Sequence, residues 1–463
     1  MAGIKRRYRD KNDITLINAI IHGDWRTKVT ILISGFGNLV RGQIIKGLIF
    51  LGYQALTWFV FLSFGLKYVR DITTLGTSVV NQVYNEVLQI YVNVPGDNSL
   101  QILLYSIFAI AVLILGQGIH FAAVKSSYAA QVRTMDRKQR PTGFLQDVHD
   151  LFDKNMHTTM LSLPTLGVLA FTVLPIIFMV LLAFTNFNRQ HQPPGNLFTW
   201  VGLENFRNVF DMNGFMGYTF IRVLGWTLIW AVFATFLNYV FGMVVAIMIN
   251  KAGIRFKSLW RTCFVIAIAV PAFVTLLFMR QALGDMGPVN VILKGIWNFF
   301  GAEYTPIQFL RDPLTARITV IIVNLWIGIP YTMLITSGIL MNIPSDLYEA
   351  ANIDGAGPVR QFRSITLPYM LIVTAPYLIT QFIGNINNFN AIFFLTAGGP
   401  MSTSYYNAGK TDLLVTWLYN LTVSFGDFNL ASVIGILTFL VSAIIALVTF
   451  NITASSRKEE TFK

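Results

Sequence analysis

Cysteine, histidine and charged residues are all scarce in this chain of 463 residues. Its single cysteine, Cys263, has no partner in the chain with which to form a disulfide, and the 5 histidines show no metal-ligand spacing. Charged residues make up only 12% of the chain, whereas hydrophobic residues make up 54% and the mean hydropathy is +0.58. These values exclude a fold held by internal disulfides and an ordinary soluble protein, and they predict a membrane protein.

Reactive constellations are also missing from the sequence. It contains no Ser/His/Asp set, no paired carboxylates and no zinc-type cluster, so we predict neither an enzyme nor a metal site. Residues 408–411, AGKT, imitate the end of a phosphate-binding loop, but Ser404 stands where the required upstream glycine would fall. We therefore expect no cofactor in this chain. The net charge of +12 does not indicate nucleic-acid binding, because the basic residues are not gathered on one soluble face.

Long apolar runs are what the chain has in abundance. A bilayer core about 30 Å thick requires about 20 helical residues. The stretches that qualify cover approximately residues 44–66, 100–119, 161–184, 223–249, 262–281, 316–340, 369–395 and 429–450. The sequence thus predicts an all-α polytopic membrane protein with about eight transmembrane helices.

The distribution of lysine and arginine sets the expected orientation. Most of the 34 basic residues lie in the N-terminal segment, in the connections after the second, fourth and sixth spans, and in the C-terminal tail. Because cytoplasmic loops carry an excess of Lys and Arg, we expect both termini to be cytoplasmic. We divide the chain into a cytoplasmic or interfacial segment, two N-terminal spans with a cytoplasmic connector that pairs two helices, a transmembrane core, and a cytoplasmic tail. These parts cover residues 1–43, 44–157, 158–452 and 453–463, and within the first we expect 13–40 to lie along the membrane interface.

Three amide side chains stand out in the seventh span. Gln381, Asn385 and Asn388 are spaced i, i+4 and i+7, which places them on one face of a continuous helix. An unpaired amide in hydrocarbon costs several kcal/mol, so this face must look into protein or a wet cavity. Two interpretations stay open. The amides, flanked by aromatic rings, bind sugar hydroxyls, or they hold neighbouring helices together.

The sixth span carries the segment LWIGIPYTM, residues 325–333. Gly328 and Pro330 are expected to disturb the helix near the middle of the membrane, where Tyr331 places a ring with a hydroxyl. Broken backbone at that depth is tolerated where it lines a cavity. A purely structural kink is the alternative.

Between these two spans lies the polar segment 349–368, EAANIDGAGPVRQFRSITLP. Its start favours a helix in which Ala350 and Ala351 would allow another surface to approach closely. Gly355 and Gly357 break that helix, and Asp354 is expected to cap the start of a second short helix. Phe362, Ile365 and Leu367 supply apolar anchors, and Pro368 is expected to begin the next membrane helix. We predict a compact helical knob on the cytoplasmic face.

This segment resembles the EAA loop of ABC-importer permeases, through Glu349, Ala350, Ala351, Gly355, Ile365, Leu367 and Pro368. The patterns NxWxGxPYxM before it and NxNNF and LTxGGP after it resemble MalF-type permeases of maltose/maltodextrin importers. The phrase FTWVGLENFRNVF at 198–210 is similar as well. Two departures bear on substrate range and architecture. Gln381 stands where enteric relatives carry a small hydroxyl residue, and the large outer domain that they insert after the third span is missing.

The resemblance implies a transport subunit that works by alternating access. It implies that Gly328, Tyr331, Asn385 and Asn388, with Gln381 one turn earlier, hold the sugar. It also implies that Glu349, Ala350, Ala351, Asp354 and Gly355 couple the chain to a separate ATPase. The implied partners are a second permease subunit, an ATPase dimer that binds ATP, and an extracellular sugar-binding protein, all at a bacterial plasma membrane.

Three functions other than maltodextrin import through an ABC transporter are compatible with a polytopic membrane protein. A permease of the same type could carry another oligosaccharide. An ion-driven secondary transporter would need an acidic residue in the membrane or duplicated halves, and the sequence shows neither. A membrane enzyme would need a reactive constellation, and none is visible.

Overall fold

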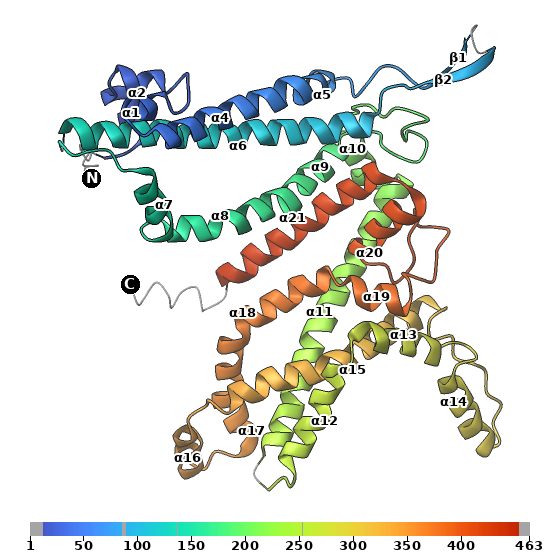
Figure 1. The fold of residues 1–463 in the computed structure, drawn as a ribbon. Helices are drawn as coiled ribbons and strands as arrows, with labels where there is room; N and C mark the ends of the chain where they lie inside the picture. Colours follow the sequence, from blue (N-terminus) through green and yellow to red (C-terminus); the bar gives the residue numbers. More distant parts are fainter. Residues whose placement is uncertain (1–12, 86–88, 137, 252, 453–463) are drawn as a thin grey trace, which may run out of the picture. The chain divides into compact units, whose positions relative to one another are not determined.

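The computed structural model describes residues 13–85, 89–136, 138–251 and 253–452, and it is almost entirely helical (Figure 1). The predicted all-α polytopic fold is confirmed. The exception to an all-helical chain is one antiparallel hairpin, β1 (Asn81–Asn85) and β2 (Ile90–Val94), in which Tyr84 pairs with Tyr91. The first twelve residues and the predicted tail 453–463 lie outside the described residues.

Seven helical segments of the described chain are long and apolar enough to cross a membrane. They are Ile44–Asp71, Ser99–Met135, Met156–Leu182, Phe215–Asn250, Pro313–Leu340, Pro358–Ile386 and Phe428–Asn451. An eighth span results if the bent pair α12 (Lys257–Ala269) and α13 (Ala272–Ala282) is taken as one, in agreement with the predicted number.

The predicted span 262–281 is not one straight helix, because its two halves meet at 86°. Pro271 begins the second half, and it has no N–H with which to continue the helix. Proline also disfavours the helical conformation of the preceding residue, and Val270 is extended, with φ −78° and ψ 123°. The bend follows directly from this Val-Pro pair.

The chain divides into two compact units, residues 1–201 and 202–463. The first unit contains three short helices, the first three membrane spans and a helix in the connector, with a π-helical turn at three places. Its helices are α1 (Leu16–His22), α2 (Trp25–Val29), α3 (Phe36–Val40), α4 (Ile44–Val60), α5 (Leu66–Asp71), α6 (Ser99–Gln131), α7 (Phe144–Phe152), α8 (Met156–Val168) and α9 (Leu174–Leu182). The π-helical turns are Phe61–Gly65, Val132–Asp136 and Leu169–Val173.

The segment that we expected to lie along the membrane interface packs against α6 (Figure 1). A buried polar network holds it there. Arg41 pairs with Asp24 and donates from Nη1 to the Ser127 hydroxyl of α6 at 3.0 Å. The Gln131 amide, also on α6, accepts from the backbone N–H of Asp24 at 2.9 Å. Burial of the Arg41 guanidinium is tolerated because Asp24 and Ser127 supply acceptors.

The second unit holds the remaining spans, the bent pair and the polar segment between the sixth and seventh spans. Its other helices are α10 (Glu204–Phe210), α11 (Phe215–Asn250), α14 (Pro288–Phe299), α15 (Pro313–Leu340), α16 (Ser345–Ile353), α17 (Pro358–Gln361), α18 (Leu367–Ile386), α19 (Phe389–Leu395), α20 (Leu414–Tyr419) and α21 (Phe428–Ile452). Its π-helical turns are Phe362–Thr366 and Asn420–Phe425.

Helix α11 packs closely against α15, which crosses it in the view of Figure 1. Small side chains allow this approach. A Cβ placed on Gly242 of α11 would lie 2.7 Å from the Cβ of Thr332 on α15. The Thr336 hydroxyl bonds back to the carbonyl of Thr332 at 2.8 Å, so its polar group is satisfied in an apolar interface. The pair α11–α15 is therefore a rigid base for the residues that project from it.

Helix α15 is unbroken, and our prediction that Gly328 and Pro330 disturb it is wrong. Pro330 is buried within the helix. Pro330 has no N–H, so a carbonyl one turn before it loses its usual partner. In this part of α15, side-chain hydroxyls bond back to the main chain, as the Thr332 hydroxyl does to the Gly328 carbonyl at 3.1 Å. Neighbouring helices and such hydroxyl bonds allow proline inside a membrane helix without a break.

Candidate functional site

The polar segment between the sixth and seventh spans forms an exposed helical loop, as predicted. We call α16, residues 354–357 and α17 the α16–α17 loop. Glu349, Ala350, Asp354 and Gly355 are exposed, and Ala351 is half-buried. The loop leaves apolar side chains uncovered. Their exposed fractions are 87% for Ile353, 68% for Val359 and 47% for Leu347. The loop therefore carries uncovered apolar side chains.

Two details of the loop differ from the prediction. Asp354 is the C-cap of α16, whereas Gly357 is the N-cap of α17. Gly355 takes the left-handed conformation, with φ +72°, so it ends α16 in the manner typical of glycine and leaves no role for an Asp354 cap at the second helix.

Pro368 stands in the first turn of α18, as expected, but α18 is the second part of a longer helical span. That span starts ten residues earlier, at Pro358, and passes through the π-helical turn Phe362–Thr366 before Pro368. Proline at a first helical position loses no hydrogen bond, and Pro358 satisfies this condition. Phe362 and Leu367, two of the predicted anchors, do pack against the buried cluster of Tyr239 and Met370.

A polar cavity of about 140 Å³ lies among α11, α15 and α18. All five residues that the resemblance implied for sugar binding line it. They are Gly328 and Tyr331 on α15, Gln381 and Asn385 on α18, and Asn388 just beyond α18. The structure therefore brings together residues that are up to sixty positions apart in the chain, and we call their enclosure the amide cavity.

The three amides do not share one helix. Helix α18 ends at Ile386, and Asn388 is the N-cap of α19, where its side-chain oxygen accepts from the N–H of Ala391 at 3.1 Å. The predicted continuous span 369–395 is therefore wrong beyond Ile386. Asparagine at an N-cap competes with helix continuation, because its oxygen satisfies a free N–H of the following helix. The turn nevertheless keeps Asn388 at the cavity.

Asn385 joins two helices as well as lining the cavity. It is buried, and its Nδ2 donates to the Thr235 hydroxyl of α11 at 2.9 Å. Its backbone carbonyl accepts from the indole N–H of Trp230, also on α11, at 3.1 Å. Its side-chain oxygen receives a long bond of 3.4 Å from Asn388. The role of holding helices together, one of the two interpretations above, is thus visible at Asn385.

Tyr331 and Gln381 are in a different situation. The Tyr331 side chain is 49% exposed, and Gln381 is half-buried. Both line the amide cavity, and each carries hydrogen-bonding atoms that can reach a ligand. Of the amide-cavity residues, these two are the ones best placed to bind a ligand without releasing a structural contact.

Helix α11 contributes polar residues that the sequence reasoning missed. Thr235, Asn238 and Tyr239 line the cavity, as do Asn324 of α15 and Tyr377 of α18. Asn324 is the first residue of the NxWxGxPYxM pattern and could have been named from it. Asn238 could have been flagged as a lone amide within an apolar span, since such residues mark functional sites in membranes.

Two of these amides are buried and incompletely bonded. The Oδ1 of Asn238 and the Nδ2 of Asn324 have no hydrogen-bond partner among the described residues. One is an acceptor and the other a donor. Buried polar atoms without partners are uncommon, and they indicate a group that a ligand or water completes.

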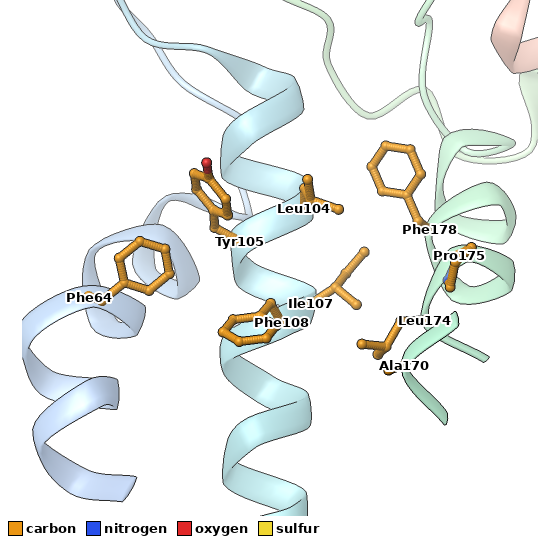
Figure 2. A pocket seen from close by; sticks show the side chains of 9 residues that line it. All are labelled: Phe64, Leu104, Tyr105, Ile107, Phe108, Ala170, Leu174, Pro175 and Phe178. Atoms are coloured by element: carbon orange, nitrogen blue, oxygen red, sulfur yellow. The ribbon is translucent and has the colours of Figure 1, made fainter. Parts of the chain in front are cut away.

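A larger cavity in the first unit is of a different kind. A groove of about 460 Å³ lies between α6 and α9, lined by apolar and aromatic side chains (Figure 2). Figure 2 shows Leu104 and Ile107 of α6 facing Leu174 and Phe178 of α9. It offers almost no polar group to orient a sugar, so we do not assign substrate to it. Among the described residues, no group of three or more His, Cys, Asp or Glu could hold a metal ion.

The loop 396–413, which follows α19, contains a buried carboxylate. Asp412 accepts from the N–H of Gly409 at 2.8 Å, while its Oδ1 has no partner among the described residues. Gly398, with φ +82°, lies so close that an added Cβ would be 2.1 Å from that oxygen. Burial raises the pKa of Asp412 to about 6.

This shift predicts a dependence of stability on pH. Because the pKa is higher in the folded protein than in the unfolded chain, the stabilisation is present below about pH 3.8 and is lost as the pH rises through about 6. Asp412→Asn should remove that loss, worth about 3 kcal/mol at neutral pH. The measurement is the Tm of the purified protein from pH 4.5 to 8, with the exposed Asp211→Asn as control. A gap between wild type and Asp412→Asn that does not widen between pH 4.5 and about 6, where the unfolded chain has lost the proton and the folded protein still holds it, would contradict it.

Comparison with known proteins agrees with this geometry. The family model described as "Binding-protein-dependent transport system inner membrane component" matches residues 238–456, which include α15 to α19 and the α16–α17 loop. The galactooligosaccharides transport system permease protein GanP of Bacillus subtilis (strain 168) is 35% identical over 430 residues, 92% of this chain and 97% of that protein.

Two further likenesses extend the comparison. The maltodextrin transport system permease protein MalC of Streptococcus pneumoniae serotype 4 is 33% identical over 428 residues, 91% of this chain and 94% of that protein. A crystal structure of a bacterial ABC transporter involved in import of the polysaccharide alginate matches with a TM-score of 0.54 at 22% identity. It covers 66% of this chain and 98% of that one, and it supports the fold. The chain belongs to the binding-protein-dependent transport system inner membrane components, as a MalF-type permease subunit of an ABC sugar importer.

Proposed function

We propose that the sugar is a maltodextrin and that it binds in the amide cavity. The observation that carries this proposal is the polar lining of the cavity, to which Tyr331, 49% exposed, and the half-buried amides of Gln381 and Asn388 contribute. A sugar hydroxyl both donates and accepts a hydrogen bond, so it can bond to the amide and hydroxyl groups of this lining. No charged side chain lines the cavity, which favours a neutral sugar.

The proposed identity of the sugar is based on the transport substrates for which similar permeases are named. Permeases named for maltodextrin are 33% identical to this chain in Streptococcus pneumoniae and 32% identical in Bacillus subtilis. A galactooligosaccharide is the second candidate, because GanP is 35% identical over nearly its whole length. Both ligands are neutral oligosaccharides, and the amide cavity offers either of them the same kinds of group.

A second permease subunit is proposed to complete the site. Ligand sites usually enclose about 300 Å³ or more, whereas the amide cavity of this chain measures about 140 Å³. A partner chain facing α15 and α18 would enclose the rest of the sugar. The further partners are an external sugar-binding protein, which delivers the ligand, and an ATPase dimer.

The α16–α17 loop is connected through helices to the amide cavity, and we propose that this connection couples the ATPase to transport. Helix α15, which carries Gly328 and Tyr331, leads directly into α16, and the span Pro358–Ile386 leads from α17 to Gln381. From Gly328 to Leu340 is twelve residues, about 18 Å of rigid helix at 1.5 Å per residue. Movement of the exposed α16–α17 loop by the ATPase would thus be transmitted to both walls of the cavity. ATP is bound by that partner, and we place the loop and both termini in the cytoplasm of a bacterial cell.

An ion-driven transporter is the competing mechanism. The described spans from α11 to α21 contain no Asp or Glu, which such a mechanism generally uses. Uptake should therefore stop when the ATPase partner is deleted. Uptake that persists on an ion gradient alone would favour the secondary transporter.

A substitution at Gln381 tests the sugar site directly. We expect Gln381→Leu to lower uptake of labelled maltodextrins by roughly tenfold, because each hydrogen bond to a ligand contributes about 1 kcal/mol and burial of an unpaired sugar hydroxyl costs more. Thr380→Val is the matched control, since Thr380 is exposed and bonds only to its own helix, at the Pro376 carbonyl. The readout is uptake across defined maltodextrins and galactooligosaccharides. Equal uptake by both variants would remove Gln381 from the site.

A further inference from the structure

A second polar cavity of the same unit, about 410 Å³, takes no part in the proposed sugar path. It lies among the N-terminal half of α11, the first turns of α15 and the loop 396–413. We call it the arginine pocket and define it by Tyr218, Arg222, Trp226, Arg317 and Tyr405. Its character is cationic and aromatic, unlike that of the amide cavity.

Two arginines line this pocket, a lysine lies over one of its tyrosines, and each of the three cations is stacked on a ring. Arg317 lies over Trp226, with its guanidinium carbon 4.6 Å from the ring centre, and Arg222 lies over Tyr218 at 5.2 Å. Lys410, at the rim, has its ammonium nitrogen 3.5 Å from the ring centre of Tyr405. Stacking orients a cation but does not neutralise it.

No carboxylate balances these charges in the described part of the chain. None of the ion pairs found there involves Arg222, Arg317 or Lys410. The one hydrogen bond of the Arg317 guanidinium joins its Nε to the backbone carbonyl of Lys410 at 2.8 Å, which fixes the side chain and leaves its outer nitrogens available. A pre-oriented guanidinium with free nitrogens is suited to a bidentate anion.

The depth of the pocket can be worked out along α15. Arg317 is 23 residues from the end of the helix at Leu340, which corresponds to about 35 Å. The hydrocarbon core is about 30 Å thick. Arg317 thus lies at headgroup level, on the membrane face opposite the α16–α17 loop. Trp226 and Tyr218 fit the enrichment of these residues at membrane interfaces.

One wall of the pocket is apolar and uncovered. Ile221 and Ile229, on the same face of α11 as Arg222, are 42% and 49% exposed, and Met212 is exposed as well. A free anion would satisfy the arginines but would make no contact with this wall. A ligand that carries a phosphate next to an acyl chain would satisfy both.

We propose that the arginine pocket binds an anionic phospholipid, with its phosphate between Arg222 and Arg317 and an acyl chain against Ile221 and Ile229. Arginine forks match phosphate geometry, and a phospholipid carries its phosphate at headgroup level, next to its acyl chains. A neutral oligosaccharide would not need the three cations.

Native mass spectrometry of the purified full-length protein, titrated with phosphatidylglycerol or with phosphatidylcholine, tests the proposal. We expect one phosphatidylglycerol to bind at least tenfold more tightly than phosphatidylcholine. Arg222→Gln should abolish that preference, and Arg222→Lys should retain part of it, because lysine keeps the charge but not the fork. Arg222 is exposed and makes no protein hydrogen bond among those found, so the variant is expected to fold. Arg280→Gln, an exposed arginine outside the pocket, is the matched control.

Competition with inorganic phosphate separates the lipid from a free anion. We expect no displacement of phosphatidylglycerol by an equal concentration of phosphate, because phosphate cannot cover the isoleucine wall. Displacement would overturn the lipid assignment. The lipid assignment would also be overturned if Arg222→Gln bound lipid as the wild type does. If that variant also lost assembly with a partner chain, the pocket would be a protein interface.

Discussion

Replacing Glu349 with lysine should reduce sugar uptake by more than tenfold while the protein still inserts into the membrane. Glu349 is exposed on α16, so its side chain stabilises no contact inside this chain that the substitution would break. Its proposed contact is with the ATPase partner, and breaking a charged contact in an interface costs about 2–5 kcal/mol. The measurement is uptake by cells together with ATP hydrolysis by the reconstituted transporter, in which we expect hydrolysis no longer stimulated by sugar.

A charge reversal outside the loop controls for the change in net charge. Glu303→Lys alters the same charge at an exposed site between α14 and α15. It should leave uptake near the wild-type level. If Glu349→Lys transports sugar as well as Glu303→Lys does, the α16–α17 loop is not the coupling element.

The second large effect is expected from adding one methyl group at Gly328. A Cβ there would lie 2.5 Å from the side-chain amide of Asn238. That amide would have to move, which would break its bond of 2.7 Å to the Ala234 carbonyl and narrow the amide cavity. We expect Gly328→Ala to lower uptake by at least tenfold, because overpacking costs about 1–3 kcal/mol and the cavity is small.

Gly338→Ala is the matched control in the same helix. No atom of this chain lies within 4 Å of a Cβ placed on Gly338, and the gain in helix propensity is the same at both positions. Gly338→Ala should therefore transport normally. Equal uptake by the two variants, measured at equal membrane expression, would show that the contact between α11 and α15 at Gly328 does not limit transport.

The membrane spans could be read from the sequence because their signal is local. A run of about twenty apolar residues has few alternatives to a membrane helix, whatever surrounds it. The span 262–281 shows where this fails. Its composition is that of a membrane helix, but the Val270-Pro271 pair bends it by 86°. The proline was visible in the sequence, and its local geometry should have outweighed the hydropathy of the run.

The amide cavity shows the opposite case. We selected Gln381, Asn385 and Asn388 because their spacing fits one face of a helix. Asn388, however, lies in a turn after α18 as the N-cap of α19, and it lines the cavity from there. Pro330 was expected to break α15, and it does not. In both places local hydrogen bonds of side chains to the main chain, from Thr332 to Gly328 and between Asn388 and Ala391, accompany the observed backbone, and hydrophobic periodicity does not report them.

The sequence alone determined that this chain is a polytopic membrane protein with an exposed helical loop, because hydropathy and glycine–proline patterns act over a few residues. It also supplied the five cavity residues through the resemblance, without their geometry. Only the tertiary structure decided that α11 forms a wall of the cavity, with Asn238 and Thr235, and that Asn385 holds two helices together. The physical reason is that a hydrogen bond or an unpaired amide is a property of two segments brought into contact, here 150 residues apart in the case of Asn385 and Thr235.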